Sequence, residues 1–192
     1  MKWITGSVMC VVFVCAVAAW PQNGNGHRNG GQNCGANCAQ LQLPASATLS
    51  ADEAKWLLYM REEEKLARDV YNELQIYGLK IFGNIALSEQ RHFDSIGTLI
   101  SRYGLTDPAQ EPGVFLNGDI QQLYNTLIVK GKLSLKDALE VGVSIEETDI
   151  DDLEKAMSAT YKRDIDNVYA NLMAGSYNHL ASFESNLEMA NR

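Results

Sequence analysis

The sequence predicts an all-α fold: an antiparallel four-helix bundle with one long crossover connection that carries a short extra helix. Apolar residues recur at steps of three and four through four segments of roughly 23 to 29 residues. From Leu49 onward, no stretch alternates between polar and β-branched apolar residues for long enough to predict a strand. Long helices that each carry one apolar face bury those faces most simply against one another, which favours a bundle.

The first 48 residues are predicted to lie outside this fold. Residues 1–19 are typical of a signal peptide, with Lys2 ahead of an apolar run at residues 8–19 and small residues at its end. That run is shorter than the roughly 20 apolar residues of a membrane span, so an uncleaved anchor is the weaker alternative. Residues 20–48 are rich in Gly, Asn and Gln and are predicted to form a flexible linker.

Export has two consequences for the mature protein. It is expected to be secreted or periplasmic, with no stable membrane span after processing. Its two remaining cysteines, Cys34 and Cys38, favour a local disulfide over a two-cysteine metal site, because oxidising compartments allow disulfides to persist.

Two long helices are predicted before the crossover. Ser50 is a helix-capping residue, and the first helix is expected to continue to about Tyr77 and end at Gly78. The second helix is expected at residues 81–103, with Gly104 as its end signal.

Three further helices follow. The segment at residues 107–113 contains two prolines and predicts a turn, and residues 119–129 predict the short extra helix. Ser134 is expected to cap the third long helix, which reaches about residue 159, and the fourth covers about residues 161–189. The bundle domain is therefore predicted at residues 49–190.

Polar side chains interrupt the apolar face of every long helix. Their positions follow the helical period: Glu64 on the first helix, Glu89 and His92 on the second, Glu146 and Asp149 on the third, and His179 on the fourth. A buried, unpaired carboxylate is costly, and several from different helices also repel one another. A pair of divalent cations would remove both costs, so these six residues are the predicted metal ligands.

The donor set narrows the choice of metal. Carboxylates and imidazoles without sulfur suit iron, manganese or zinc. Two iron ions are the first expectation, with manganese or zinc as alternatives. The remaining alternative is a structural bundle whose polar core residues form a network without metal. The net charge of −8 argues against a nucleic-acid partner, which would need a basic surface.

The motifs also resemble the ferritin-like superfamily. "EKLARDVY" places Glu64 seven residues before Tyr71, and "EQRH" matches a Glu-x-x-His pair formed by Glu89 and His92. More closely, residues 48–188 resemble a bacterial and archaeal ferritin-like family that is catalogued as a domain of unknown function. The resemblance implies metal ligation by Glu64, with Tyr71 nearby, and a bridging role for Glu89.

One position departs from the ferritin pattern. The second Glu-x-x-His is replaced by "SYNH", so Ser176 stands where a carboxylate would be, while His179 is retained. Glu146 and Asp149 on the third helix are expected to compensate. The substitution argues against iron mineralisation of the ferritin type.

Three functions are consistent with these motifs. The first hypothesis is an exported di-iron or di-manganese oxidoreductase, ferroxidase-like or peroxidase-like, that reacts with oxygen or peroxide at ions bridged by Glu89 and Glu146. In it, Tyr71 either assists the centre or is simply a packed core residue. The second is a non-enzymatic bundle that sequesters metal, and the third is a metal-free structural or interaction bundle. A homodimer is the expected assembly if the chain is not a monomer.

Overall fold

The structure is a computed structural model that describes residues 48–192. Within that range the chain forms five α-helices, one 3-10 helix and no strand, which confirms the all-helical prediction. The helices are α1 (Ala51–Leu74), η1 (Gln75–Tyr77), α2 (Lys80–Arg102), α3 (Gly118–Gly131), α4 (Leu135–Ser158) and α5 (Arg163–Ala190). None of the described helices is long and apolar enough to cross a membrane. The predicted signal peptide, the linker and the Cys34–Cys38 pair lie outside the described residues.

The helix ends follow the capping signals of the sequence. Ser50 and Glu53 form a reciprocal capping box at the start of α1, which satisfies two backbone N–H groups that lack a partner within the helix. Ser134 caps α4 through the backbone N–H of Asp137. Gly78 and Gly104 follow the first two helices with positive φ angles of 69° and 68°, a conformation that glycine adopts without steric cost.

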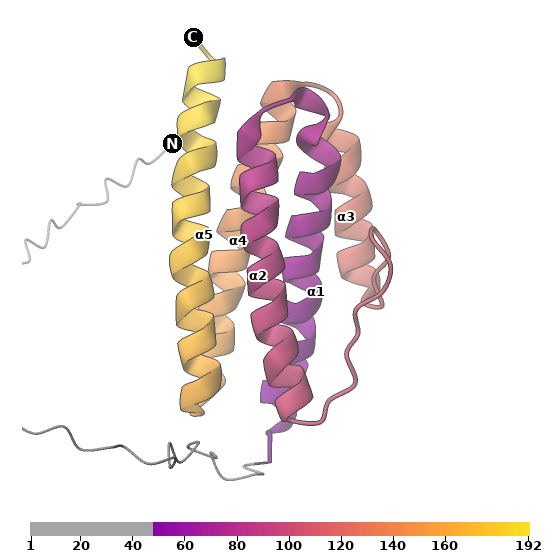
Figure 1. Ribbon diagram of the computed structural model, residues 1–192, viewed down its shortest axis with the longest axis vertical. Coiled ribbons are helices and arrows are strands. Elements are labelled where there is room, and N and C mark those ends of the chain that lie inside the picture. The colour runs from indigo at the N-terminus through magenta and orange to yellow at the C-terminus, as the bar shows by residue number, and fades with distance from the viewer. Residues whose placement is uncertain (1–47) are drawn as a thin grey trace, which may run out of the picture. The chain divides into compact units, whose positions relative to one another are not determined.

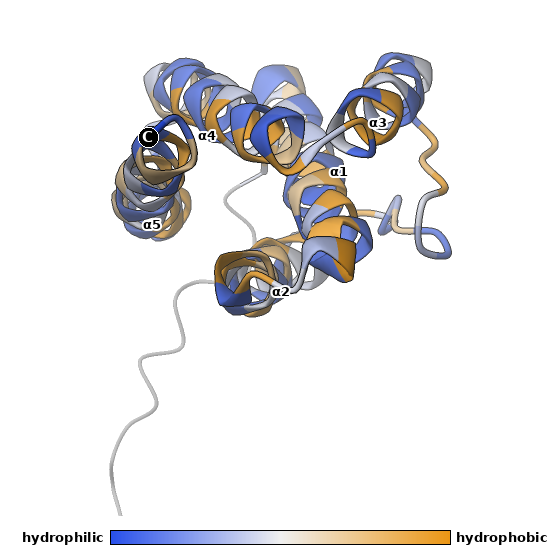
Figure 2. Cartoon of the chain, turned by 90° about the horizontal axis from the view of Figure 1, so that it is seen from above, coloured by the Kyte–Doolittle hydropathy of each residue, from blue (hydrophilic) through white to orange (hydrophobic). Residues whose placement is uncertain are grey.

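The four long helices lie side by side, and neighbouring helices are antiparallel (Figure 1). The most extensive contacts join α1 to α2 and α4 to α5, and further contacts join α1 to α4 and α2 to α5. The shorter α3 packs only on the outer side of α1 and α4, as the view along the helices in Figure 2 shows. The apolar faces of the long helices turn toward their common axis in the same view.

The apolar core forms two clusters along the helices. One contains Tyr71, Phe82 and Phe183, together with residues of α3. The other contains Leu57, Leu153 and their neighbours on α2 and α5. Apart from Glu53 and Asp69 of α1, the buried polar residues of the long helices occupy the sequence positions between the two clusters, so a polar layer crosses the core.

The crossover between α2 and α3 is fixed to α1 by a buried lysine. Lys65 is almost fully buried, pairs with Asp69 at 2.7 Å, and donates to the backbone oxygens of Glu111 and Val114. Asp69 also accepts a hydrogen bond from the backbone N–H of Gly113. The outer face of α1 is therefore covered by the crossover, and its charged groups have partners.

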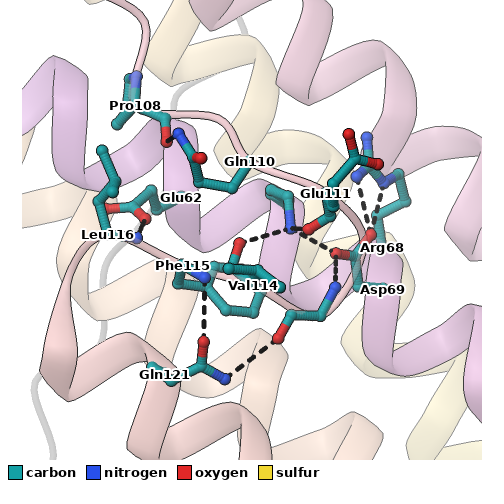
Figure 3. A network of polar contacts seen from close by, with 12 residues as sticks. Glu62, Arg68, Asp69, Pro108, Gln110, Glu111, Val114, Phe115, Leu116 and Gln121 are labelled. Atoms are coloured by element: carbon teal, nitrogen blue, oxygen red, sulfur yellow. Dashed lines mark hydrogen bonds and ion pairs between the residues drawn. The ribbon is translucent and has the colours of Figure 1, made fainter.

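Glu62 attaches the next part of the crossover to the same helix. Its carboxylate accepts hydrogen bonds from the backbone N–H groups of Leu116 (Figure 3) and Asn117, directly before α3 begins. Glu62 points away from the centre of the helix bundle and toward the crossover, which fixes the rotation of α1 about its own axis. Glu64, two residues later, then faces the interior.

Candidate metal centre

Four helices contribute buried polar side chains to one layer of the core. α1 supplies Glu64, α2 supplies Glu89 and His92, α4 supplies Glu146 and Asp149, and α5 supplies His179. Each of the six residues is at most 9% exposed. The packing of α1, α2, α4 and α5 brings together side chains that are far apart in the sequence, such as Glu64 and His179.

Five of these residues form two groups that could each hold a metal ion. Glu64, Glu89 and His92 form the first group, and Glu89, Glu146 and His179 form the second. Within each group, one ligand atom from every residue lies within 4.8 Å of the others. Glu89 belongs to both groups, whereas Glu146 belongs to the second alone.

The distances in the two groups mirror one another. His92 Nδ1 lies 2.8 Å from Glu89 Oε2 and 3.3 Å from Glu64 Oε2. His179 Nδ1 lies 2.7 Å from Glu89 Oε1 and 3.4 Å from Glu146 Oε2. The Glu89 carboxylate thus lies between two imidazoles, and each of its oxygens faces one of them.

The orientation of these atoms fits a metal better than it fits hydrogen bonds. Among the described residues, both Nδ1 atoms, Glu89 Oε1 and Glu64 Oε1 are buried without a hydrogen-bond partner, although two carboxylate oxygens lie within 3.4 Å of each Nδ1. Buried polar atoms nearly always have a partner. Ligands bound at about 2.1 Å and at right angles to each other are about 3 Å apart, close to the distances found here.

A comparison with protein-family models identifies the family over most of the chain. The family model described as "Uncharacterized protein domain (DUF2202)" matches residues 53–192. The chain belongs to the DUF2202 family. The matched range contains every residue of the candidate centre.

A relative from an archaeon shares this domain. The uncharacterized protein MJ0754 of Methanocaldococcus jannaschii is 49% identical over 140 residues, which cover 70% of this chain and 75% of the relative. The crystal structure of that hypothetical protein resembles the present one with a TM-score of 0.74 at 46% identity, over 76% of this chain and 85% of that chain. The DUF2202 fold described here is therefore similar to one determined in a crystal.

Asp149 lies in neither of the two groups of this DUF2202 domain. One of its oxygens accepts a 2.5 Å hydrogen bond from Ser176, and the other is buried without a partner. Ser176, three residues before His179, is fully buried on α5. A carboxylate from α4 therefore reaches the part of the layer where α5 carries only a hydroxyl.

Tyr71 contacts the second group directly. Its hydroxyl donates a 2.6 Å hydrogen bond to Glu146 Oε1, and its ring packs against Phe183 at 5.1 Å between centroids. Burial, and then the charge of Glu146, raise the pKa of Tyr71 well above its usual range. The phenol therefore stays protonated and orients the Glu146 carboxylate.

The pKa values of two carboxylates in the DUF2202 centre, Glu89 and Glu146, are shifted in opposite directions. Burial favours the neutral form of Glu89, but the close imidazoles of His179 and His92 outweigh it and lower its pKa to about 2. Burial and the nearby Glu89 raise the pKa of Glu146 to about 7, although His179 and Tyr71 act in the opposite direction. Burial disfavours the imidazolium of His179, but Glu146 and Glu89 raise its pKa to about 10.

The other two predicted carboxylates lack a sufficient counter-charge. Burial raises the pKa of Glu64 well above its usual range, and the charges of Asp149 and Glu89 raise it further. The pKa of Asp149 is raised in the same way by burial and by Glu146, although Ser176 acts against this. A divalent cation would supply the positive charge that this layer lacks.

Two acidic residues outside the predicted set, Glu63 and Asp152, are also buried beside the centre. Glu63 is 6% exposed, and the pKa of its carboxyl is raised by burial and by the charges of Asp149 and Asp152. The helical period places Glu63 at the edge of the apolar face, and a run of three glutamates is more often solvated, so its burial was not predicted. Glu147, by contrast, is exposed on α4.

Proposed function

We propose that this DUF2202 protein is an exported, ferritin-like di-metal carboxylate protein whose centre reacts with oxygen or peroxide. The observation that carries the proposal is the Glu89 carboxylate, which lies between His92 and His179 while Glu64 and Glu146 close the two groups. A carboxylate shared by two groups is the arrangement expected for a bridging ligand. The antiparallel packing of the four long helices supports assignment to the ferritin-like bundles.

The donor set supports iron or manganese, with zinc as an alternative. Three carboxylates and two imidazoles, without sulfur, surround the two positions. Bound iron or manganese would supply the redox chemistry. Glu89 would hold both ions, Glu64 and His92 would complete one position, and Glu146 and His179 would complete the other.

The chain's own residues prepare the centre in two further ways. Tyr71 holds Glu146 in place by a hydrogen bond and keeps its proton at neutral pH. The apolar clusters on both sides of the layer exclude bulk water, which strengthens electrostatic interactions in the site.

Metal loading tests the proposal. The mature protein is loaded anaerobically with Fe(II), desalted, analysed for iron per chain, and then mixed with oxygen or with peroxide. We expect two iron ions per chain and visible absorption of oxidised iron after mixing. A variant with Glu89→Ala and His92→Ala should lose the metal, whereas Glu147→Ala, an exposed glutamate on α4, should retain it.

The outcomes separate the candidate functions. Retained metal without any reaction with oxygen or peroxide would favour the second candidate, a metal-sequestering bundle, which the same ligand geometry supports. Wild-type protein that retains no iron, manganese or zinc would contradict both and leave the metal-free bundle. Thermal unfolding provides a second readout, because a cation that binds only the folded chain raises its melting temperature.

A further inference from the structure

A file of polar side chains connects the candidate metal centre to the protein surface along the seam between α1 and α4. Tyr59 and Glu63 are four residues apart on α1, and Asp149 and Asp152 are three residues apart on α4, so each pair lies on one face of its helix. The hydroxyl of Tyr59 donates a 3.0 Å hydrogen bond to Asp152, which joins the two faces.

The antiparallel directions of α1 and α4 then fix the order of the side chains. From the Tyr59–Asp152 contact, one turn further along α1 leads to Glu63, and one turn back along α4 leads to Asp149. Each step is about 5 Å along the helix axes. The next residues inward are Glu64 and Glu146, which belong to the metal centre.

Exposure decreases in the same order. The side chain of Lys155 is 61% exposed and pairs with Asp152 at 2.5 Å; that of Asp152 is 13% exposed. Glu63 is 6% exposed and Glu64 is 1% exposed. The file therefore begins at solvent beside a lysine and ends at the first group of the centre.

Two carboxylate oxygens in the file point at no partner. Within residues 48–192, Glu63 Oε2 and Asp149 Oδ1 are both buried without a hydrogen-bond partner, in residues that are 6% and 5% exposed. Burial without a partner is costly, and neighbouring carboxylates add repulsion. A cation bound there would reduce both the cost of burial and the repulsion. The side chains therefore offer a transient binding site between the surface and the centre.

The file is built for passage rather than for tight binding. In each of the two groups of the centre, three ligand atoms lie within 4.8 Å of one another. Among the described residues, Glu63, Asp149 and Asp152 do not form a third group of this kind. A cation held there would keep part of its water shell and would be released readily to the tighter position.

We propose that Asp152 and Glu63 form the entry route by which a divalent cation reaches the centre, with Lys155 as a competing cation at its mouth. The proposal rests on the proposed metal-binding function. It assigns a role in metal uptake to two residues that are not ligands of the centre.

Stopped-flow uptake of Co(II) by the mature metal-free protein tests this route, with the absorption of bound Co(II) as the readout. Glu63→Gln and Asp152→Asn should slow uptake about tenfold, because a carboxylate path raises the local cation concentration. The final number of ions per chain should be unchanged. Lys155→Gln, an exposed change that does not threaten folding, should accelerate uptake.

Asp151→Asn is the matched control. Asp151 precedes Asp152 on α4 but is exposed, so this variant removes the same charge without touching the file, and we expect a rate close to that of the wild type. Equal rates for Glu63→Gln, Asp152→Asn and Asp151→Asn, with full loading, would overturn the route alone. A lower final stoichiometry in Glu63→Gln would also overturn it, because Glu63 would then be a ligand. Wild-type protein that binds no Co(II) would overturn the route together with the metal function.

Discussion

Ser176 donates a 2.5 Å hydrogen bond to Asp149 and thereby joins α5 to α4 inside the polar layer. The serine hydroxyl also lies 3.0 Å from the backbone oxygen of Leu172, so its single proton is shared between two acceptors. In a centre with two Glu-x-x-His motifs, the position of Ser176 would carry a glutamate. Here the carboxylate comes from the neighbouring helix, and the serine orients it.

Replacement of Ser176 by alanine should destabilise the metal-free protein. The buried Asp149 carboxyl would lose the one hydrogen-bond donor that the described residues provide, which costs about 1–3 kcal/mol. Urea unfolding in the presence of a chelator measures the change in the free energy of unfolding. Ser182→Ala is the control, because Ser182 makes an exposed hydrogen bond to Asn178 on the same helix. An equal effect of the two substitutions would show that Ser176 does not support Asp149.

The metal-free protein should become less stable as the pH rises from 4.5 to 7. The pKa of Glu146 is about 7 in the folded protein and close to the ordinary 4.5 in the unfolded chain, so the folded state binds more protons across this range. Glu146→Gln should remove roughly 3 kcal/mol of this pH dependence. Glu89 adds little slope here, because its pKa falls from 4.5 to about 2 on folding and its contribution therefore lies below this range. His179 adds to the same downward trend only near pH 7 and above, because its pKa rises from 6.5 to about 10 on folding.

Chemical unfolding at several pH values in chelator measures this dependence. Glu147→Gln, an exposed neighbour on α4, should leave the slope as in the wild type. A slope that is unchanged by Glu146→Gln would refute the assignment. Added divalent metal should reverse the trend, because protons compete with the cation for the same carboxylates.

Gly175 should be required for the position of His92. A Cβ atom at Gly175 would lie 2.6 Å from His92 Nε2, closer than such atoms approach in proteins. Gly175→Ala should therefore displace the imidazole and weaken metal binding about tenfold, as expected when a residue behind a ligand is changed. Equilibrium dialysis with Co(II) measures the affinity. Gly118→Ala is the control, because nothing lies within 4 Å of a Cβ there.

The buried Lys65–Asp69 pair should matter far more than a surface pair of the same length. Lys65→Met leaves a buried carboxylate with less positive charge and should cost about 3–5 kcal/mol. Lys132→Met breaks the exposed pair with Glu73, also 2.7 Å long, and should cost about 0–1 kcal/mol. Thermal unfolding and limited proteolysis of the crossover distinguish the two. Similar losses of stability would mean that the crossover does not depend on Lys65.

The helices were predictable because their signals are local. Ser50, Ser134, Gly78 and Gly104 mark ends that the structure places within a few residues of the expected positions. The burial of the charged residues on the outer face of α1 was not predictable. It depends on the crossover, which covers that face, and helical periodicity contains no information about what a distant segment covers.

The polar layer was predictable in part for the same reason. The helical period assigns Glu64, Glu89 and His179 to inner faces, because a residue's direction follows from its number. The division into two groups depends on how the helices are staggered, which no single helix encodes. Glu146 belongs to one of the two groups, so its expected role as a second bridge alongside Glu89 stays a prediction. The need for a glycine at position 175 is equally a property of the packed pair α2 and α5.

The polar layer also determines how the domain melts. Each long helix passes through both apolar clusters, and the layer between them is held together by groups that repel one another when no counter-ion is present. With a cation in place, we expect both ends to lose their amide protection in hydrogen exchange together, as a single cooperative unit. After chelation, the two ends should lose their amide protection in two separate steps, because the polar layer is then the least stable section of each long helix.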